Sequence, residues 1–287
     1  MKRIFVLFVI SAVTLCSCSF SLFNEAETTT TTEYVSPYAT DINGQLVPKH
    51  EDVSESALDP MLFGFDENGR AIYKDTEQKI ITGIDVSVFQ GDIDWNAVAE
   101  DGIDFVMLRI GYRGYGEKGI MGIDDRFYQN YNGASAVGLD VGVYFYSQAI
   151  NAEEAVEEAQ FVLDSLGDLE LAYPVAYDWE HVEDDAARTK DMTNEKITEC
   201  AKAFCEEIEK AGRKAIIYFN CEIGYFEYDL KKVENYDFWL AEYENYPSFV
   251  YDYKMWQYTD KGSVAGINGD VDLNISTVDY SAIGDFG

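Results

Sequence analysis

Two carboxylates stand one residue apart where an apolar run comes to its end. The run "YPVAYDWE" (residues 173–180) ends in Asp178 and Glu180, and an acidic loop follows. Side chains two positions apart on a strand point the same way, so both carboxylates should project together with Trp179 turned to the opposite face. Two carboxylates held close cannot both ionise freely, and one pKa rises until that group keeps a proton near neutral pH. A proton donor beside a carboxylate is the pair that breaks a glycosidic bond. The alternative is a solvated acidic loop.

Polar residues also end the other predicted strands. Asp85 ends the first strand and Asp272 lies in the last, so a closed barrel would make them neighbours at the mouth where active sites lie. These two acids would suit the stabilisation of a developing oxocarbenium ion. We predict that the same strand ends bind substrate, because aromatic rings offer flat apolar surfaces for sugar faces; the alternative for each ring is a place in the core. The candidates are Arg109, Tyr144, Tyr146, Tyr218, Trp239, Trp256 and Gln257.

After residue 80, predicted strands alternate with predicted helices, and these elements must position the candidate residues. Strands are predicted over 81–89, 104–112, 140–148, 173–180, 213–220, 237–243, 253–259 and 270–276, and helices over 92–102, 125–138, 151–167 and 193–212. Strands that alternate with helices pair in parallel through right-handed crossovers. The prediction is an α/β fold, a TIM-like (β/α) barrel with little helix in its last third. A doubly wound open sheet is the alternative, but no glycine-rich phosphate loop follows the first strand.

The N-terminus has the pattern of an export signal. Two basic residues precede an apolar run and the letters "LCSC", which is typical of a secretory signal peptide over residues 1–18. The end of that run resembles the lipobox of bacterial lipoproteins, in which Cys18 would become the lipidated N-terminus. Ordinary cleavage without lipid is the alternative, because Cys16 is an unusual residue at its position. We therefore expect an extracytoplasmic protein at the cell surface, anchored to the bacterial membrane by lipid or otherwise secreted.

The rest of the chain divides into a tether and a catalytic domain. Residues 19–80 begin with a Thr-rich stretch that has no apolar period, which predicts a disordered tether over 19–46. A short hairpin follows, because Asn68 and Gly69 stand between apolar flanks. Residues 81–287 form the predicted catalytic barrel domain.

Charge and motif content exclude several classes of function. The formal net charge is −32, so charge attraction to nucleic acid or to an anionic membrane is excluded. His181 is the only histidine of the predicted barrel domain and no G-x-S-x-G pattern occurs, which argues against a zinc site and a serine triad. An EF-hand at "DVDLN" would need Gly and Glu where Ile275 and Ser281 stand. We predict no metal, no cofactor and a monomer.

Several stretches together resemble glycoside hydrolase family 25, the bacterial and phage lysozymes. They are "GIDVSVFQGDIDW", "YDWE", "FWLAEY" and "MWQYTDKGSVAGINGDVDLN", and the resemblance covers residues 81–276. It implies five β/α units followed by three antiparallel-leaning strands. It also implies hydrolysis of the β-1,4 bond between N-acetylmuramic acid and N-acetylglucosamine in peptidoglycan glycan strands.

By the same resemblance, Glu180 matches the general acid of the family and Asp178 its partner carboxylate. Asp85 and Asp272 match the aspartates of the first and last strands. Two alternatives remain open on the sequence alone. One is a barrel glycosidase that acts on a chitin-type polymer, and the other is a non-catalytic wall-binding lipoprotein.

Overall fold

The computed structural model of the chain describes residues 38–283. The strands are β1 (Tyr38–Thr40), β2 (Leu46–Pro48), β3 (Phe63–Phe65), β4 (Ala71–Tyr73), β5 (Ile81–Val86), β6 (Phe105–Arg113), β7 (Met121–Ile123), β8 (Asp140–Ser147), β9 (Val175–Trp179), β10 (Ala215–Asn220), β11 (Asp237–Ala241), β12 (Met255–Gly262) and β13 (Val271–Ser276). The helices are α1 (Trp95–Glu100), α2 (Phe127–Ala136), α3 (Ala152–Leu166), α4 (Asn194–Lys210), α5 (Cys221–Phe226), α6 (Leu230–Val233) and α7 (Tyr280–Ile283), with 3₁₀ turns η1 (Pro60–Leu62) and η2 (Val88–Gln90). Among these residues, no helix combines the length and the apolar character that crossing a membrane requires.

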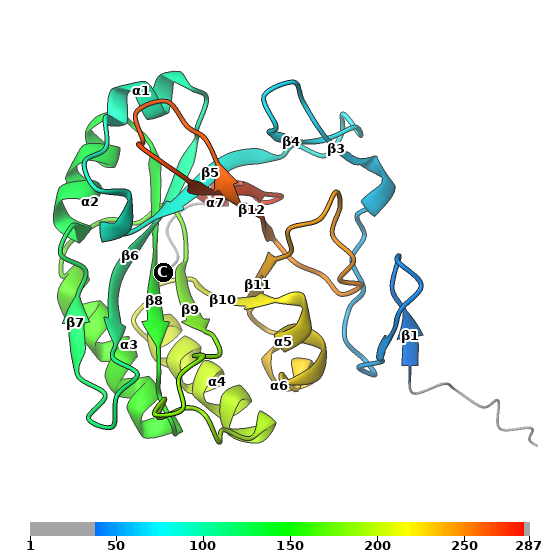
Figure 1. Cartoon of the computed structure of the whole chain (residues 1–287), viewed down its shortest axis with the longest axis vertical. Coiled ribbons are helices and arrows are strands. Elements are labelled where there is room, and N and C mark those ends of the chain that lie inside the picture. Colours follow the sequence, from blue (N-terminus) through cyan, green and yellow to red (C-terminus); the bar gives the residue numbers. More distant parts are fainter. Residues whose placement is uncertain (1–37, 284–287) are drawn as a thin grey trace, which may run out of the picture. The chain divides into compact units, whose positions relative to one another are not determined.

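The central sheet closes into a barrel. Its strand order is β5-β13-β12-β11-β10-β9-β8-β6-β7, and β5 also pairs with β6. The pairing of β5 with β6 closes the ring, and the short strand β7 pairs with β6, outside the ring. Helices α2, α3 and α4 pack outside β6, β8, β9 and β10, as Figure 1 shows. The predicted TIM-like barrel is confirmed.

The direction of the closing strands corrects one expectation. Strands β11 and β12 pair in parallel with their neighbours β10 and β11, and β13 alone is antiparallel, to both β12 and β5. The expectation of three antiparallel-leaning strands is therefore wrong for β11 and β12. The chain between β11 and β12 is long enough to return to the far end of the barrel, whereas the shorter loop after β12 turns straight back into β13.

Alternation along the strands separates two apolar layers. Side chains that face outward join a large cluster with the helices, and those that face inward form a smaller cluster inside the barrel. At the end of the barrel where the parallel strands begin, the rings of Phe105 and Tyr173 stack with centroids 4.2 Å apart, and Tyr280 packs edge-on against Tyr173. Phe105 fits there because the strand beside it carries Gly83, where an added Cβ would lie 2.3 Å from the ring.

Residues 38–80, which precede the barrel, form two short hairpins. Strands β1 and β2 form one hairpin and β3 and β4 form a second, at the Asn-Gly position where the sequence predicts one. The predicted disorder of residues 19–46 is therefore wrong for residues 38–46. Long-range contacts explain the order: the backbone N–H of His50 donates to the hydroxyl of Tyr251 at 2.5 Å. The predicted signal peptide, the lipidation at Cys18 and the first part of the tether lie outside the described residues.

The N-terminal segment covers the side of the barrel that lacks helices. Trp256 of β12 faces outward and packs against Phe63, with ring centroids 5.1 Å apart. The ring centroid of Phe65 lies 5.7 Å from that of Tyr258, which is also in β12. Glu55 forms an isolated backbone bridge with Tyr251. In Figure 1 the β3–β4 hairpin accordingly lies on the side of β12 and the β1–β2 hairpin on the side of α5, both opposite α2 and α3. The hairpins take the place that helices hold elsewhere around the ring.

Substitution of Gly83 by Ala tests the packing inside the barrel. The added methyl group would overlap the ring of Phe105, which the stacked Tyr173 keeps from moving, so we expect a loss of about 1–3 kcal/mol in the free energy of unfolding. Gly116→Ala is the matched control, because an added Cβ there meets no atom within 4 Å. Chemical denaturation monitored by circular dichroism measures both variants. Equal stability of Gly83→Ala and the wild type would contradict the packing described above.

Candidate active site

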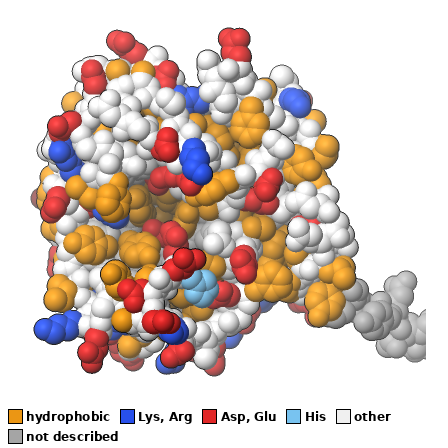
Figure 2. Space-filling model, viewed as in Figure 1, with side chains coloured by type: hydrophobic (Ala, Val, Ile, Leu, Met, Phe, Trp, Pro, Cys, Tyr) orange, Lys and Arg blue, Asp and Glu red, His pale blue; other side chains and the backbone are white. Residues whose placement is uncertain are grey.

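The barrel brings the four predicted carboxylates to one mouth. Strand register places Asp272 directly opposite Asp85, and Asp178 ends β9 with Glu180 just beyond it. All four border one cavity of about 290 Å³. Its lining consists of Asp85, Ser87, Phe89, Gln90, Arg109, Tyr144, Tyr146, Asp178, Glu180, Tyr218, Trp239, Tyr243, Gln257 and Asp272. The face drawn in Figure 2 is hollowed near its middle, with acidic and hydrophobic side chains gathered around the hollow.

Asp85 is held by two amide side chains. Its Oδ2 accepts hydrogen bonds from Nε2 of Gln257 and from Nδ2 of Asn274, each at 2.8 Å. The amide oxygens are occupied in turn, because Gln257 accepts from the hydroxyl of Tyr218 at 2.9 Å and Asn274 accepts from the indole N–H of Trp239 at 2.8 Å. Those donors fix both amides with their nitrogens toward Asp85. The network therefore presents two N–H groups to one carboxylate.

Burial acts on the pair formed by Asp85 and Asp272. Desolvation raises the pKa of Asp85 to about 6, although the hydrogen bonds from Asn274 and Gln257 oppose the rise. Desolvation and the charge of Asp85 raise the pKa of Asp272 to about 8. Two carboxylates so close cannot both ionise at low cost. Asp272 therefore carries the proton near neutral pH, while Asp85 is the anion.

Asp178 and Glu180 form the second pair. Asp178 is only 5% exposed, and burial together with Glu180 raises the pKa of Asp178 well above its ordinary value. Burial also raises the pKa of Glu180, which the hydrogen bond between the two side chains opposes. The Oδ1 atom of Asp178 is buried and has no hydrogen-bond partner among the described residues. This pair can hold one proton and still offer a desolvated acceptor to a ligand.

Residues on either side of Glu180 face away from the cavity. Trp179 is fully buried in the outer layer, and its ring packs edge-on against His181 with centroids 4.9 Å apart. The side chain of His181 is exposed and pairs with Glu227. The strand alternation read from the sequence therefore holds through the end of β9.

Arg109 is the one cation in the lining of the cavity. Its guanidinium makes an ion pair with the buried Asp124, with Nη2 to Oδ2 at 2.7 Å, and lies 4.9 Å from the centroid of the Phe89 ring. The same Oδ2 accepts the backbone N–H of Val88 at 3.0 Å. Arg109 thus borders the cavity as predicted, but much of its charge is neutralised by Asp124. Its main contact toward the opening is Phe89, whose side chain is 80% exposed.

Five of the six other predicted substrate-binding residues line the cavity, and the sixth does not. Those in the lining are Tyr144, Tyr146, Tyr218, Trp239 and Gln257. Trp256 faces outward, where it is fully buried beneath Phe63 and donates its indole N–H to the backbone oxygen of Glu242 at 2.8 Å. The prediction for Trp256 is therefore wrong. Successive residues of a strand face opposite sides, so Gln257 could point inward only with Trp256 outward.

Some residues of this mouth were not among the predicted site residues. Asn274 could have been found, because it lies two positions after Asp272 on the same strand and shares its face. Tyr243 follows β11 and donates its hydroxyl to Gln257 at 2.8 Å. Phe89 lies in a 3₁₀ turn, because β5 ends at Val86 and the predicted strand over 81–89 is three residues too long. Asp124, which pairs with Arg109, lies in a loop, where alternation gives no signal.

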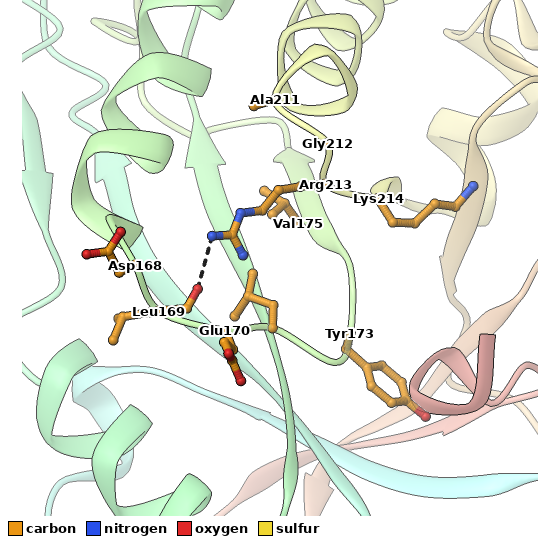
Figure 3. A pocket seen from close by; sticks show the side chains of 10 residues that line it. Asp168, Leu169, Glu170, Tyr173, Val175, Ala211, Gly212, Arg213 and Lys214 are labelled. Carbon is orange, nitrogen blue, oxygen red and sulfur yellow. Dashed lines mark hydrogen bonds between the residues drawn. The ribbon is translucent and has the colours of Figure 1, made fainter. Parts of the chain in front are cut away.

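A second cavity, of about 380 Å³, lies at the opposite end of the barrel. It is formed by the residues that precede β9 and β10, including Tyr173 and Arg213. In the close view of Figure 3, Arg213 reaches across it and donates to the backbone oxygen of Leu169 at 3.0 Å. Active sites of such barrels lie at the ends where the parallel strands finish, so we assign this cavity no catalytic role. Within residues 38–283, no cluster of side chains has the composition of a metal site.

Comparisons with known proteins agree with this geometry. Residues 84–267 match the family model described as glycosyl hydrolases family 25. The chain is 28% identical over 194 residues to the autolytic lysozyme of Clostridium acetobutylicum. This match covers 67% of this chain and 54% of that relative. It is 27% identical over 206 residues to lysozyme M1 of Streptomyces globisporus, and this match covers 68% of this chain and 67% of the relative.

The fold recurs in a solved structure. A family 25 glycosyl hydrolase from Bacillus anthracis superposes with a TM-score of 0.59 at 24% identity, over 70% of this chain and 90% of that one. The chain thus spans about half the length of the clostridial relative and most of the length of the Bacillus enzyme. The family match contains β6 to β12 and three of the four carboxylates at the mouth. This chain belongs to glycosyl hydrolases family 25.

Proposed function

We propose that the chain is a lysozyme that hydrolyses the β-1,4 bond between N-acetylmuramic acid and N-acetylglucosamine in peptidoglycan. The observation that carries the proposal is the meeting of four carboxylates at one mouth, with raised pKa values for all four. Binding alone would not require buried acids, since stacking on rings and hydrogen bonds suffice for sugars. Membership of family 25 and the lysozyme relatives support the same substrate class.

Glu180 acts as the general acid in this proposal. It is less buried than Asp178 and borders both the catalytic cavity and the groove next to it, so its carboxyl can reach a glycosidic oxygen. Burial raises the pKa of both carboxyls of this pair, so the pair keeps a proton in the free cleft. An acetamido N–H of the substrate that donates to Oδ1 of Asp178 would favour the ionised form of Asp178. The proton then moves to Glu180, which passes it to the departing sugar oxygen.

The other two carboxylates assist at the sugar that becomes cationic. Asp178, once ionised, and the pair of Asp85 and Asp272, which carries one negative charge near neutral pH, stabilise the positive charge at the anomeric carbon. The substrate's own acetamido group or an ionised carboxylate assists attack. Asp85, held by Gln257 and Asn274, orients the sugar and raises the pKa of Asp272. Tyr144, Tyr146, Tyr218 and Trp239 supply the ring surfaces of the cleft, with Arg109 and Gln257 at its polar side.

We also propose that the enzyme works outside the cytoplasm and acts as a monomer without a cofactor. The support is the signal-like N-terminus and the wall polymer that family members act on. Lipidation of Cys18 would anchor it at the cell surface. Metabolic labelling with a radioactive fatty acid tests this, and a Cys18→Ser variant that keeps the label would contradict it.

Replacement of Glu180 by Gln tests the assignment of the acid. The amide keeps the shape of the side chain but cannot donate the proton, so turnover should fall by at least about 10²-fold. The assay is the release of reducing ends from purified peptidoglycan, with chitin oligomers as a second substrate. Glu183→Gln, the same change in the exposed loop beyond the strand, should leave turnover intact. Near wild-type turnover of Glu180→Gln would overturn the assignment, and faster cleavage of chitin than of peptidoglycan would overturn the substrate.

The raised pKa values of Asp85 and Asp272 predict how stability depends on pH. A carboxyl whose folded pKa lies above its unfolded value of 3.8 binds more protons in the folded state, so its contribution is complete below pH 3.8. That contribution is lost as pH rises through about 6 for Asp85 and about 8 for Asp272. The melting temperature should therefore fall as pH rises from about 4 to about 8, the range between the unfolded value and the higher of the two folded values.

The Asp272→Asn variant isolates this effect. It removes one of the two titrating carboxyls, so the fall in melting temperature between about pH 6 and pH 8 should be shallower than in the wild type. Asp270→Asn is the matched control, since Asp270 is exposed on the loop just before β13, two residues before Asp272. Differential scanning fluorimetry across the pH series measures all three proteins. Parallel curves for Asp272→Asn and the wild type would show that Asp272 is not protonated in the folded protein.

A further inference from the structure

A groove adjoins the catalytic cavity on the side of the first hairpin. Its volume is about 750 Å³, larger than that of the catalytic cavity itself. The two cavities share Glu180, Tyr218 and Tyr243 in their linings, so they are continuous at the general acid of the proposed mechanism. A chain that is cleaved beside Glu180 therefore has a ready path into the groove.

One wall of the groove comes from outside the family match. Asp41, Asn43, Gln45 and Val47 of the β1–β2 hairpin line it, whereas the match begins only at residue 84. The opposite wall is built by α5 and by the loop after β11. This wall of the groove thus lies outside the part of the chain that the family model matches.

The hairpin wall is held in a fixed position. Asp41 is buried and accepts the backbone N–H of Gln45 at 2.7 Å, which closes the turn. His50, just after the hairpin, donates its backbone N–H to Tyr251, and its ring nitrogen lies 3.0 Å from the backbone oxygen of Tyr225 in α5. Because contacts hold both the turn of the hairpin and the residue just after it, this wall can bind a ligand without first having to become ordered.

The free groups of the groove match the chemistry of N-acetylated sugars. The exposed side chains of Asn43 and Gln45 make no hydrogen bond within residues 38–283, so their amides can both donate to and accept from hydroxyl and acetamido groups. Phe226 and Tyr243 are 53% and 50% exposed and offer ring surfaces at the groove. Rings beside amide groups are the usual combination for uncharged sugars.

The charge of the groove argues against the acidic peptides of the cell wall. The lining residues include the carboxylates of Asp41, Glu222 and Glu244 but neither lysine nor arginine. A peptide stem that carries free carboxylates would meet like charge there. A neutral glycan meets no such penalty.

We propose that this groove binds further sugars of the same glycan strand, beyond those next to the cleaved bond. The inference rests on the proposed function, and it names the length of glycan that the site recognises. The hairpin makes the enzyme favour long strands over short fragments. The added sugars contribute binding that is equal before and during cleavage, so they lower KM and leave kcat unchanged.

The test is a double variant, Asn43→Ala/Gln45→Ala, assayed on glycan whose stem peptides have been removed and whose lactyl carboxyl groups are capped as amides, so that the substrate is uncharged. For an octasaccharide, the loss of two hydrogen-bonding side chains should raise KM about tenfold with kcat unchanged. For a tetrasaccharide, which has only the sugars next to the cleaved bond, the proposal predicts that neither constant changes. The matched control is Thr40→Ala/Leu46→Ala, since these two exposed residues of the same hairpin lie outside the groove. The control should behave as the wild type on both substrates.

Two outcomes would overturn the groove assignment. One is an octasaccharide KM unchanged in the double variant while the wild type cleaves normally. The other is an effect confined to glycan that still bears stem peptides, which would make the groove a peptide site. Failure of the wild type to cleave any glycan would instead refute the proposed function. Calorimetry with Glu180→Gln then decides on the groove separately: it stands if the octasaccharide binds more tightly than the tetrasaccharide and loses that advantage with the hairpin changes.

Discussion

The antiparallel pairing of β13 with β5 is the constraint on which the site depends. Together with the parallel pairing of β5 with β6 it closes the barrel, and it sets Asp272 directly across from Asp85. Without closure there is no mouth, because the ends of β9 and β5 would lie at different places along an open sheet. Closure also removes the open strand edges that a curled sheet would otherwise expose. One strand pairing thus supplies both the shape of the cleft and two of its four acids.

Burying four carboxylates together is costly, and the surrounding side chains limit that cost in two ways. Amide groups whose direction is fixed by Tyr218 and Trp239 give Asp85 the donors that an anion needs. At the other two aspartates, protonation removes the buried charge. Asp178 and Asp272 stay protonated at pH values where exposed aspartates are ionised. An acid catalyst needs this combination of an anion and a retained proton at one place.

Local patterns were enough to predict the barrel and the carboxylates, but not the parts that depend on distant contacts. Alternation along a strand puts Asp178 with Glu180, and strand order puts Asp85 near Asp272. The same rule shows why Trp256 and Gln257 could not both face the cleft. Residues 38–46 resemble a tether in composition, yet they are ordered by contacts such as that of the nearby His50 with Tyr251, which lies 201 positions away. No local pattern carries that information.

The residues that match the family model do not make a complete barrel. The match ends at residue 267, before β13 begins at Val271. A fragment trimmed to those limits would lose the strand that joins β12 to β5, together with Asp272. It would also expose the aromatic face of β12 that the N-terminal hairpins cover. Two unpaired sheet edges beside a bare apolar surface favour association between copies, so we expect a fragment cut to residues 84–267 to self-associate where the full chain does not.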